Sequence, residues 1–405
     1  MTDPSPAPAP ALSHLKVLDV STLLAGPLVG TLLGDFGADV VKLELPGRGD
    51  PLRMLPPHKD GVPLWWKVAN RNKKGLTLDL RTERGSALLK RMIPRFDVFI
   101  ENFRPGTAER WGIGPDNLLA AHPGLTILRV SGFGQRGPYA GRPGFHRVGE
   151  AMSGYLSIQG EADGPPQHSG YPIADAATGL FGAVGVLIAL LDRARNPERA
   201  GQVIPVSLLE SMFRIVDFLA IQYDQLGEVP ARTGNRNAYA APGNLYRTRD
   251  GAWFCVAATT QSIFERLAQA IGRPDLIDDS RFASNPDRVA NVEALDAVIA
   301  AWMADHDLAD VMAAMERHHV AAGPVKAIDD IFADPHVAAN DMIVSVMDEA
   351  LGTIRMQGVV PTLSATPGAV RKPGPDLGAD NNRLYNELLG LDETEIEALR
   401  RDGVI

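Results

Sequence analysis

The chain has 405 residues, 45% of them apolar and 22% charged, which is the composition of a globular protein long enough for two domains. Its net charge of −9 argues against a nucleic-acid partner, because the phosphate backbone would be repelled. The single cysteine, Cys255, excludes an intrachain disulfide and a multi-cysteine metal site, and we expect no bound metal.

The first half of the chain predicts alternating strands and helices. Residues 2–10 are rich in Pro and Ala and predict a disordered tail, not a secretory signal. Pro27 suits the first turn of a helix, which should end near Gly37. Such alternation implies right-handed crossovers and an α/β fold with a parallel sheet. The predicted strands are Val17–Val20, Val40–Glu44, Leu76–Leu80, Val98–Glu101 and Leu125–Val130.

The middle of the chain predicts two long helices. The apolar run Gly179–Leu191 is too short to span a bilayer and predicts a buried helix. Ser207–Asp224 predicts a second helix. With neither a membrane span nor a secretory signal in view, we expect a cytoplasmic protein without a membrane partner.

Composition changes at residues 227–242, which are rich in Gly, Asn, Arg and Pro, and we place a domain boundary there. A compact helical region should follow, and the chain should end in two strands and a helix. The corresponding segments are a strand at Trp253, helices up to about Val325, strands at Met342–Met347 and Thr353–Val360, and a helix near Glu393–Arg401.

The first turn after a predicted strand does not fit a dinucleotide site. Leu24-Ala-Gly-Pro has one glycine where close approach of a pyrophosphate needs three. We therefore expect no nicotinamide or flavin and no other tightly bound cofactor.

Asp175 stands just before the apolar helix and allows two interpretations. It can cap the helix by accepting N–H bonds from the first turn. The same position would keep its carboxylate ionised, because the helix dipole and the unpaired N–H groups favour an anion. An ionised carboxylate beside a bound thioester is a competent nucleophile.

A series of short motifs in one order resembles the class III CoA-transferase family, which includes formyl-CoA transferase and carnitine CoA-transferase. The resemblance runs over nearly the whole chain after Leu15. Its motifs are Val17-Leu-Asp-Val, Ala25-Gly-Pro, Gly37-Ala-Asp-Val-Val-Lys-Leu-Glu, Gly49-Asp, Asn70-Arg-Asn-Lys, Glu101-Asn-Phe-Arg-Pro-Gly, Phe133-Gly-Gln-Arg-Gly-Pro-Tyr, Ala151-Met-Ser-Gly, Asp175-Ala-Ala-Thr-Gly, Val206-Ser-Leu-Leu-Glu, Ala322-Gly-Pro-Val and Asp334-Pro-His-Val.

This resemblance implies a transfer of CoA from an acyl-CoA to a free carboxylic acid, with Asp175 as the acyl-accepting nucleophile. CoA is then a co-substrate, and neither ATP nor a metal is required. His146 and Gly243 are candidates for the substrate pocket, the latter as part of a loop that covers the reacting carbonyl. The positions that match the family's CoA contacts are Leu23, Leu24, Ala25, Asn102, Phe103 and Arg110, and Lys73 is a further candidate for a phosphate contact. The basic residues among them suit the phosphates of CoA.

The resemblance also implies a fold. A Rossmann-like large domain would be built from both ends of the chain, residues 1–225 and 331–405. A smaller α+β domain, residues 226–330, would be inserted between them, and two chains would form an interlocked homodimer. Leu45 departs from the family where some members place an Arg against the adenine, so apolar packing of the adenine is expected here.

Two alternatives remain open. Related racemases move an α-proton between a His–Glu pair and an Asp, but Phe145 and Thr260 stand at the positions of that His and Glu. His146 is adjacent to Phe145, which leaves the register open. A non-catalytic acyl-CoA binding protein would keep Lys73 and Arg110 but would not need Asp175.

Overall fold

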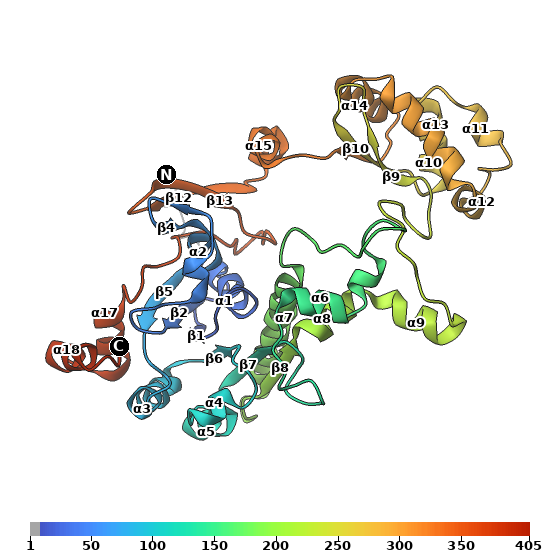
Figure 1. Cartoon of the computed structure of the whole chain (residues 1–405). Helices are drawn as coiled ribbons and strands as arrows, with labels where there is room; N and C mark the ends of the chain where they lie inside the picture. The colour runs from blue at the N-terminus through green and yellow to red at the C-terminus, as the bar shows by residue number, and fades with distance from the viewer. Residues whose placement is uncertain (1–8) are drawn as a thin grey trace. The chain divides into compact units, whose positions relative to one another are not determined.

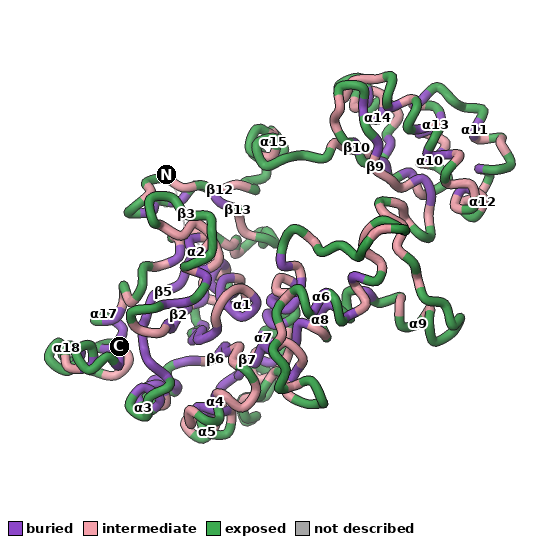
Figure 2. The backbone as a smooth tube through the Cα atoms, viewed as in Figure 1, coloured by how far each residue is buried: buried purple, intermediate pink, exposed green. Residues whose placement is uncertain are grey.

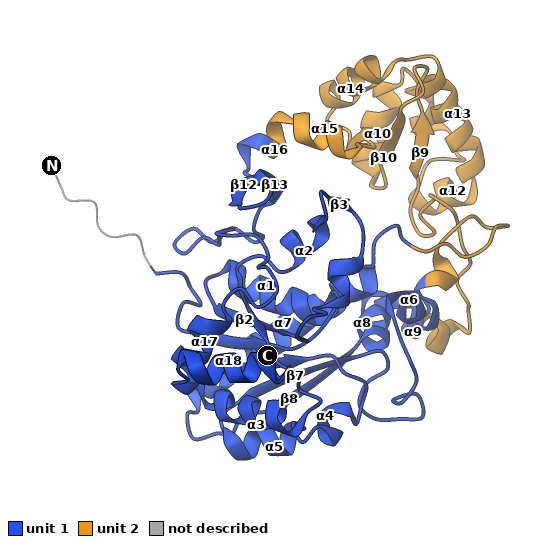
Figure 3. Ribbon diagram, turned by 60° about the vertical axis from the view of Figure 1, so that its left-hand side comes forward, with its two compact units in different colours: residues 1–155, 169–221, 338–405 blue, residues 156–168, 222–337 orange. Residues whose placement is uncertain are grey.

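The computed structural model describes residues 9–405, so almost all of the tail predicted at residues 2–10 lies outside the described part. The chain divides into two compact units (Figure 3). Unit 2 takes in a short segment, Leu156–His168, that the composition change near residue 227 did not indicate. Unit 1 comprises the chain up to Tyr155, Ser169–Ile221 and Ala338–Ile405, and unit 2 comprises Leu156–His168 and Gln222–Val337.

Unit 1 is built around a six-stranded parallel sheet, which confirms the predicted α/β fold (Figure 1). In space the strands follow the order β5-β2-β1-β6-β7-β8, and each neighbouring pair is parallel. This is the doubly wound order, in which the direction of winding reverses between β1 and β6. The loops after these two strands therefore diverge and leave a crevice. The strands are β1 (Lys16–Asp19), β2 (Asp39–Glu44), β5 (Lys73–Thr77), β6 (Val98–Glu101), β7 (Thr126–Ser131) and β8 (Val203–Ser207).

Helices bury both faces of this sheet, so neighbouring strand residues enter different cores. On β1, Val17 packs with α1 and α7 whereas Leu18 packs with α3, α17 and α18. Figure 2 shows the central strands as buried. Each large apolar side chain buried in this way contributes about 1.5–3 kcal/mol. The helices are α1 (Ala25–Asp35), α3 (Glu83–Met92), α7 (Ile173–Arg195), α17 (Asn381–Leu389) and α18 (Glu393–Arg401).

The other elements of unit 1 are short, and α4, α5 and α8 among them add side chains to the two cores. They include two antiparallel hairpins, β3 with β4 and β12 with β13. The bounds are β3 (His58–Lys59), β4 (Val62–Pro63), α2 (Leu64–Ala69), α4 (Thr107–Arg110), α5 (Pro115–Ala121), α6 (His146–Met152), α8 (Leu208–Ile215), β12 (Ile343–Asp348) and β13 (Gly352–Gln357), with 3₁₀ turns at Pro51–Met54 and Ile93–Arg95.

Two predicted helices differ from the observed ones. The single helix predicted over Ser207–Asp224 is wrong, because Val216 (φ −89°, ψ 54°) separates α8 from α9 (Asp217–Leu226). The apolar helix α7 has 23 residues and a mean hydropathy of 2.0 over its most apolar stretch, so by length and composition it reaches the size of a membrane span.

The core helix of a globular protein passes the same test, and α7 has a core face. Gly179 of this helix lies against Leu28 of α1, where an added Cβ would stand 2.7 Å from the leucine side chain. The glycine therefore allows α1 and α7 to approach closely.

Unit 2 combines a three-stranded antiparallel sheet with helices, in the strand order β11-β10-β9. Phe254 of β10, Phe264 of α10 and Leu295 of α13 lie in its core. The elements are β9 (Gly243–Arg247), β10 (Trp253–Ala257), α10 (Gln261–Ala270), α11 (Asp275–Asp278), α12 (Asn285–Ala290), α13 (Val292–Ala304), α14 (Leu308–Arg317), β11 (Ala322–Pro324) and α15 (Ile328–Ala333); α16 (Pro335–Ala339) follows at the return to unit 1.

Candidate active site

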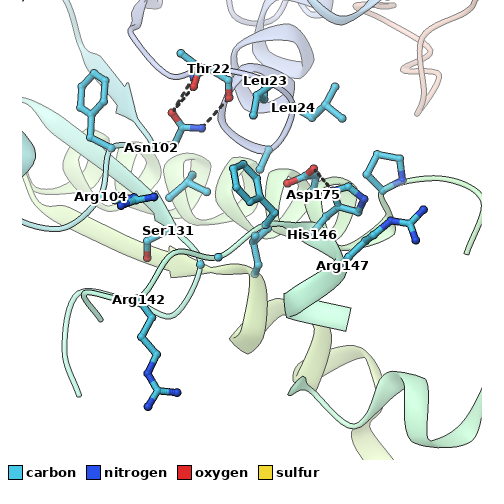
Figure 4. Close-up of a pocket in the computed structure, with 18 of the residues that line it drawn as sticks. Thr22, Leu23, Leu24, Asn102, Arg104, Ser131, Arg142, His146, Arg147 and Asp175 are labelled. Carbon is cyan, nitrogen blue, oxygen red and sulfur yellow. Dashed lines mark hydrogen bonds and ion pairs between the residues drawn. The ribbon is translucent and has the colours of Figure 1, made fainter. Parts of the chain in front are cut away.

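A cavity of about 630 Å³, here called cavity 1, lies at the carboxyl edge of the parallel sheet in unit 1 (Figure 4). Much of its wall comes from the end of β7 and from the segments that follow β1, β6, β7 and β8. In a doubly wound sheet ligands bind at this edge, where the strand order reverses. The wall residues from these segments are Thr22, Leu23, Leu24, Ala25, Asn102, Phe103, Arg104, Pro105, Val130, Ser131, Gly132 and Leu208.

The loop after β1 is held in an uncommon conformation by a buried ion pair. Leu23 has a φ of +66°, which a non-glycine residue rarely adopts. Its N–H donates to the two carboxylate oxygens of Asp50 at 3.0 and 3.2 Å. Asp50 also pairs with Lys42 at 3.2 Å, and both side chains are fully buried. The pair therefore fixes the position of the loop that lines cavity 1.

Asn102 joins the loops after β1 and β6. Its Oδ1 accepts the N–H of Thr22 at 2.8 Å, and its Nδ2 donates to the Thr22 carbonyl at 2.7 Å. Phe103 follows, with its ring packed edge-on against Trp111 at 4.9 Å between centroids. Both loops are thus tied together on the side where the crevice opens.

Asp175 projects into cavity 1 from the first turn of α7 and is largely buried, with 17% of its side chain exposed. It is the third residue of the helix and Pro172 is the N-cap, so the predicted capping role is wrong. Figure 4 shows its carboxylate facing His146, the first residue of α6, whose Nδ1 lies 3.7 Å from Oδ2.

The charge of Asp175 is governed by burial and by a second carboxylate. Desolvation and, after it, the negative charge of Glu150 raise the pKa of Asp175 to about 7. Glu150 is 1% exposed and stands one turn after His146 on α6, so both face α7. The position of Asp175 in the sequence predicts a carboxylate held ionised by the helix terminus, but its pKa shifts in the opposite direction because burial outweighs that effect.

Lys73 does not reach the cavity, and its predicted contact with a CoA phosphate is wrong. It is fully buried at the start of β5. Its ammonium donates to Asp19 at 2.9 Å, to the Pro27 carbonyl at 2.6 Å and to Asn70 at 2.9 Å, which uses all three N–H groups. Lys73 therefore braces β1 and α1 from inside the sheet.

Arg110 is not among the residues that line cavity 1, and Gly243 belongs to the other unit. Arg110 ends α4, is exposed and donates to Thr107 Oγ1 at 2.9 Å, and it is absent from the walls of this cavity. Gly243 begins β9 in unit 2. The role of Gly243 in covering the reacting carbonyl stays a prediction.

Cavity 1 contains three arginines that the sequence argument did not select. Arg104, Arg142 and Arg147 line it, and within residues 9–405 they form no ion pair with an acid. Arg104 stands inside the Glu-Asn-Phe-Arg-Pro-Gly motif, so its motif was a usable signal. The cavity is therefore locally basic although the chain has a net charge of −9.

A second cavity of about 290 Å³, cavity 2, adjoins cavity 1 and shares Thr22 and Phe103 with it. Its walls combine leucines with two arginines, around the loop after β2 and the end of β5. These residues are Leu43, Leu45, Leu78, Leu80, Arg48 and Arg81.

Comparison with known proteins gives one consistent family. The family model described as CoA-transferase family III matches residues 12–381. Among curated proteins, the succinyl-CoA–D-citramalate CoA-transferase of Chloroflexus aurantiacus is 44% identical over 402 residues, covering 99% of this chain and 100% of that protein. The succinate–glutarate CoA-transferase of Agrobacterium fabrum is 34% identical over 402 residues, covering 97% and 99% respectively.

Solved structures agree. A CAIB/BAIF family protein from Brucella suis has a TM-score of 0.83 and 33% identity, covering 94% of this chain and 100% of that one. Rv3272 from Mycobacterium tuberculosis has a TM-score of 0.81 and 30% identity, covering 92% and 99%.

Proposed function

The chain belongs to CoA-transferase family III, enzymes that move CoA between acyl-CoA thioesters and carboxylic acids, and from this premise we propose that Asp175 is the nucleophile of the transfer. The observation that carries the proposal is the position of its carboxylate. It is largely buried in a basic cavity at the crevice of a doubly wound sheet. A carboxylate shielded from water in this way is a strong nucleophile when ionised.

In the first half-reaction, a carboxylate oxygen of Asp175 attacks the thioester carbon of the donor. The C–S bond breaks, and an acyl-aspartyl anhydride and CoA thiolate form. The thiolate then attacks the Asp175 carbonyl, releases the donor acid and leaves an aspartyl-CoA thioester. The acceptor carboxylate reverses these steps and regenerates the Asp175 carboxylate. Each intermediate keeps the energy of an activated carboxyl group, so no ATP is consumed.

CoA would extend through both cavities. We place its pantetheine arm in cavity 1 along Leu23, Leu24 and Ala25, and its nucleotide in cavity 2. The leucines of cavity 2, with Leu45 among them, suit the flat apolar faces of an adenine. Arg48 is positioned to meet phosphate there, since arginine forms charge-assisted bonds with phosphate.

The substrate acids are proposed from the relatives. The curated relatives include CoA-transferases of succinyl-CoA with D-citramalate, L-malate and glutarate. These acids are short and carry two carboxylates. We propose the same class here, with succinyl-CoA as a donor, and a panel of mono- and dicarboxylic acceptors assayed with succinyl-CoA tests this choice.

The racemase alternative is disfavoured by the site. A racemase needs bases on opposite faces of an α-carbon, but His146 and Asp175 are 3.7 Å apart, which leaves no space for a carbon between them. If a 2-methylacyl-CoA exchanged its α-hydrogen with deuterated solvent in the absence of an acceptor acid, the racemase interpretation would prevail.

The direct test replaces Asp175. Asp175→Ala and Asp175→Asn should abolish CoA exchange and retain CoA binding. Above about pH 7 the native carboxylate is an anion that burial disfavours, so the neutral asparagine should not weaken the fold. Hydroxylamine should modify Asp175 in the native enzyme when acyl-CoA is present. Transfer retained by Asp175→Ala would refute the mechanism.

A homodimer is the proposed assembly, and the family resemblance makes it an interlocked one. It is supported by α7, which exposes the apolar side chains Leu180, Val184, Ile188 and Leu191 at helical spacing on one side. Exposed apolar rows of this kind mark interaction surfaces. The same proposal accounts for an apolar helix whose core-facing residues are mostly small.

A further inference from the structure

A third cavity of about 180 Å³, cavity 3, lies beside cavity 1 in unit 1. It shares three residues with cavity 1, namely Leu24, Trp65 and Asp175. The proposed nucleophile therefore stands in the wall between the two cavities. The remaining walls of cavity 3 are Leu28, Thr31, Leu32, Asp35, Val68, Ala69, Arg71, Tyr171, Ala176 and Gln357.

Most of this lining is apolar. Leu28 and Leu32 are one turn apart on α1, and Trp65 and Val68 come from α2. All four are half-buried, so each keeps surface that a bound group can cover. An alkyl chain placed there would leave water at a gain of about 0.8 kcal/mol for each methylene buried.

The polar groups inside the lining are already satisfied by one another. Arg71 forms a two-pronged pair with Asp35, Nε to Oδ1 at 3.0 Å and Nη2 to Oδ2 at 2.6 Å. The Thr31 hydroxyl donates to the Ala69 carbonyl at 2.6 Å. This part of the wall is electrically neutral and suits an uncharged chain. The exposed residues Tyr171 and Gln357 add a phenol and an amide to the lining.

A thioester that reacts with Asp175 needs space on two sides of the nucleophile. Its carbonyl carbon bears two arms, the sulfur that leads to CoA and the carbon chain of the acid. When a nucleophile attacks this carbon, the two arms point in different directions. Cavity 1 shares Thr22 and Phe103 with cavity 2, so the direction proposed for CoA leads from Asp175 toward this shared wall. Figure 4 shows Leu24 next to Asp175, at the wall that cavity 3 shares.

We propose that cavity 3 is the acyl recess of the enzyme and takes the carbon chain of the donor and acceptor acids. The proposal rests on the proposed function of Asp175 and adds to it the place of the acid. The volume of cavity 3, about 180 Å³, is below the roughly 300–1,000 Å³ usual for pockets that hold a whole small-molecule ligand. The recess therefore selects short carbon chains. The terminal carboxylate of a dicarboxylic acid accepts hydrogen bonds from Tyr171 and Gln357.

Two substitutions test the recess in opposite directions. Val68→Trp fills it, and Leu32→Ala enlarges it. We compare kcat/KM for butyryl-CoA and hexanoyl-CoA with kcat/KM for acetyl-CoA, with one acceptor acid throughout. In Val68→Trp the butyryl-to-acetyl ratio of kcat/KM should fall about tenfold or more. In Leu32→Ala the hexanoyl-to-acetyl ratio should rise by about the same factor. The reason is that each methylene group in an apolar pocket changes the ratio of kcat/KM between two substrates about 10-fold or more.

Leu55→Ala provides the matched comparison. Leu55 lines cavity 1 and not cavity 3, so its truncation reports whether the chain lies in cavity 1 instead. A changed chain-length ratio in Leu55→Ala together with an unchanged ratio in Leu32→Ala would overturn the proposal. Unchanged ratios in both Val68→Trp and Leu32→Ala, with folded variants by circular dichroism, would overturn it as well.

The proposed function and the recess fail in different ways. If the native enzyme transfers CoA neither from these donors nor from succinyl-CoA, the proposed function itself is wrong. If transfer proceeds and both cavity 3 variants keep the native chain-length preference, only the recess is wrong.

Discussion

In the mechanism we propose, Asp175 must be an anion to attack, yet its surroundings favour the neutral form. Burial and the charge of Glu150 raise its pKa to about 7, so about half of the free enzyme carries the reactive form at that pH. The same burial keeps water away from the anhydride. A raised pKa also makes the carboxylate more basic and hence a better nucleophile. The raised pKa therefore lowers the fraction of Asp175 that is ionised but makes each ionised carboxylate more nucleophilic.

Glu150→Gln should move the acid limb of activity to lower pH. The glutamate charge disfavours the Asp175 anion, so its removal lowers the pKa of Asp175. The other groups that face Asp175, His146 and Tyr171, remain in place. The measurement is kcat/KM between pH 5 and 9, which reports ionisation in the free enzyme.

The control for this profile is Asp192→Asn on the same helix. Asp192 is 17 residues further along α7, about 25 Å away at 1.5 Å per residue, and should leave the limb where it is. An acid limb that stays fixed in Glu150→Gln, or moves upward, contradicts the electrostatic role given to Glu150.

For single residues, the sequence indicated which side chains line the site better than it indicated how far each one is buried and which groups surround it. Asp175, Leu23 and Phe103 lie in the cavity as their motifs indicated. Lys73 fails because a lysine in a motif carries no sign of burial, and its partner Asp19 is 54 residues away in the sequence. The direction of the Asp175 pKa shift was predicted wrongly for the same reason, since the shift arises from burial and, after it, from the charge of Glu150 across the contact between α6 and α7.

At the scale of elements, the loop after β1 depends on Asp50, and its replacement should weaken substrate binding. Asp50→Ala removes the acceptor for the Leu23 N–H and leaves the buried ammonium of Lys42 without its partner. Breaking a buried pair costs about 3–5 kcal/mol of stability. Misplacement of the loop should also raise KM for acyl-CoA about tenfold, while kcat changes less.

A double variant separates these two effects. Lys42→Met with Asp50→Leu replaces the pair by apolar groups and should recover stability, measured by thermal melting. Because leucine accepts no hydrogen bond, KM should stay high. Recovery of the native KM in the double variant would show that Asp50 stabilises the fold without positioning the loop.

Local signals decide which elements could be predicted. Strand β6 has its predicted bounds, and α18 begins at Glu393 because Asp392 forms a capping box with Glu395. Strand β8 was missed because Pro205 argues against a strand. The structure places β8 at the edge of the sheet, paired with β7 alone, where a proline is tolerated.

For the whole molecule, the features that the sequence did not predict are contacts between segments that are far apart in the chain. Helix α17 packs on β5, where Tyr385 donates to the Thr77 carbonyl at 2.7 Å across 308 residues of sequence. No local sequence pattern predicts that the C-terminal segment packs back on the sheet of unit 1. The family resemblance was the basis for expecting it. The exposed apolar row of α7 is a similar case, because the periodicity of the sequence predicts a helix but does not indicate which surface covers its apolar side.

The proposed homodimer gives the last prediction. The native protein should scatter light as a particle of twice the 43.5 kDa of one chain, and it should remain so on dilution if the chains are interlocked. Val184→Glu with Ile188→Glu places two charges on the exposed row of α7 and should prevent assembly, because buried unpaired charges are costly. Met347→Glu, on the exposed side of β12, is the matched change outside the row and should leave the mass unchanged. A native mass of one chain, or a dimer that persists in the α7 variant, would contradict this assembly.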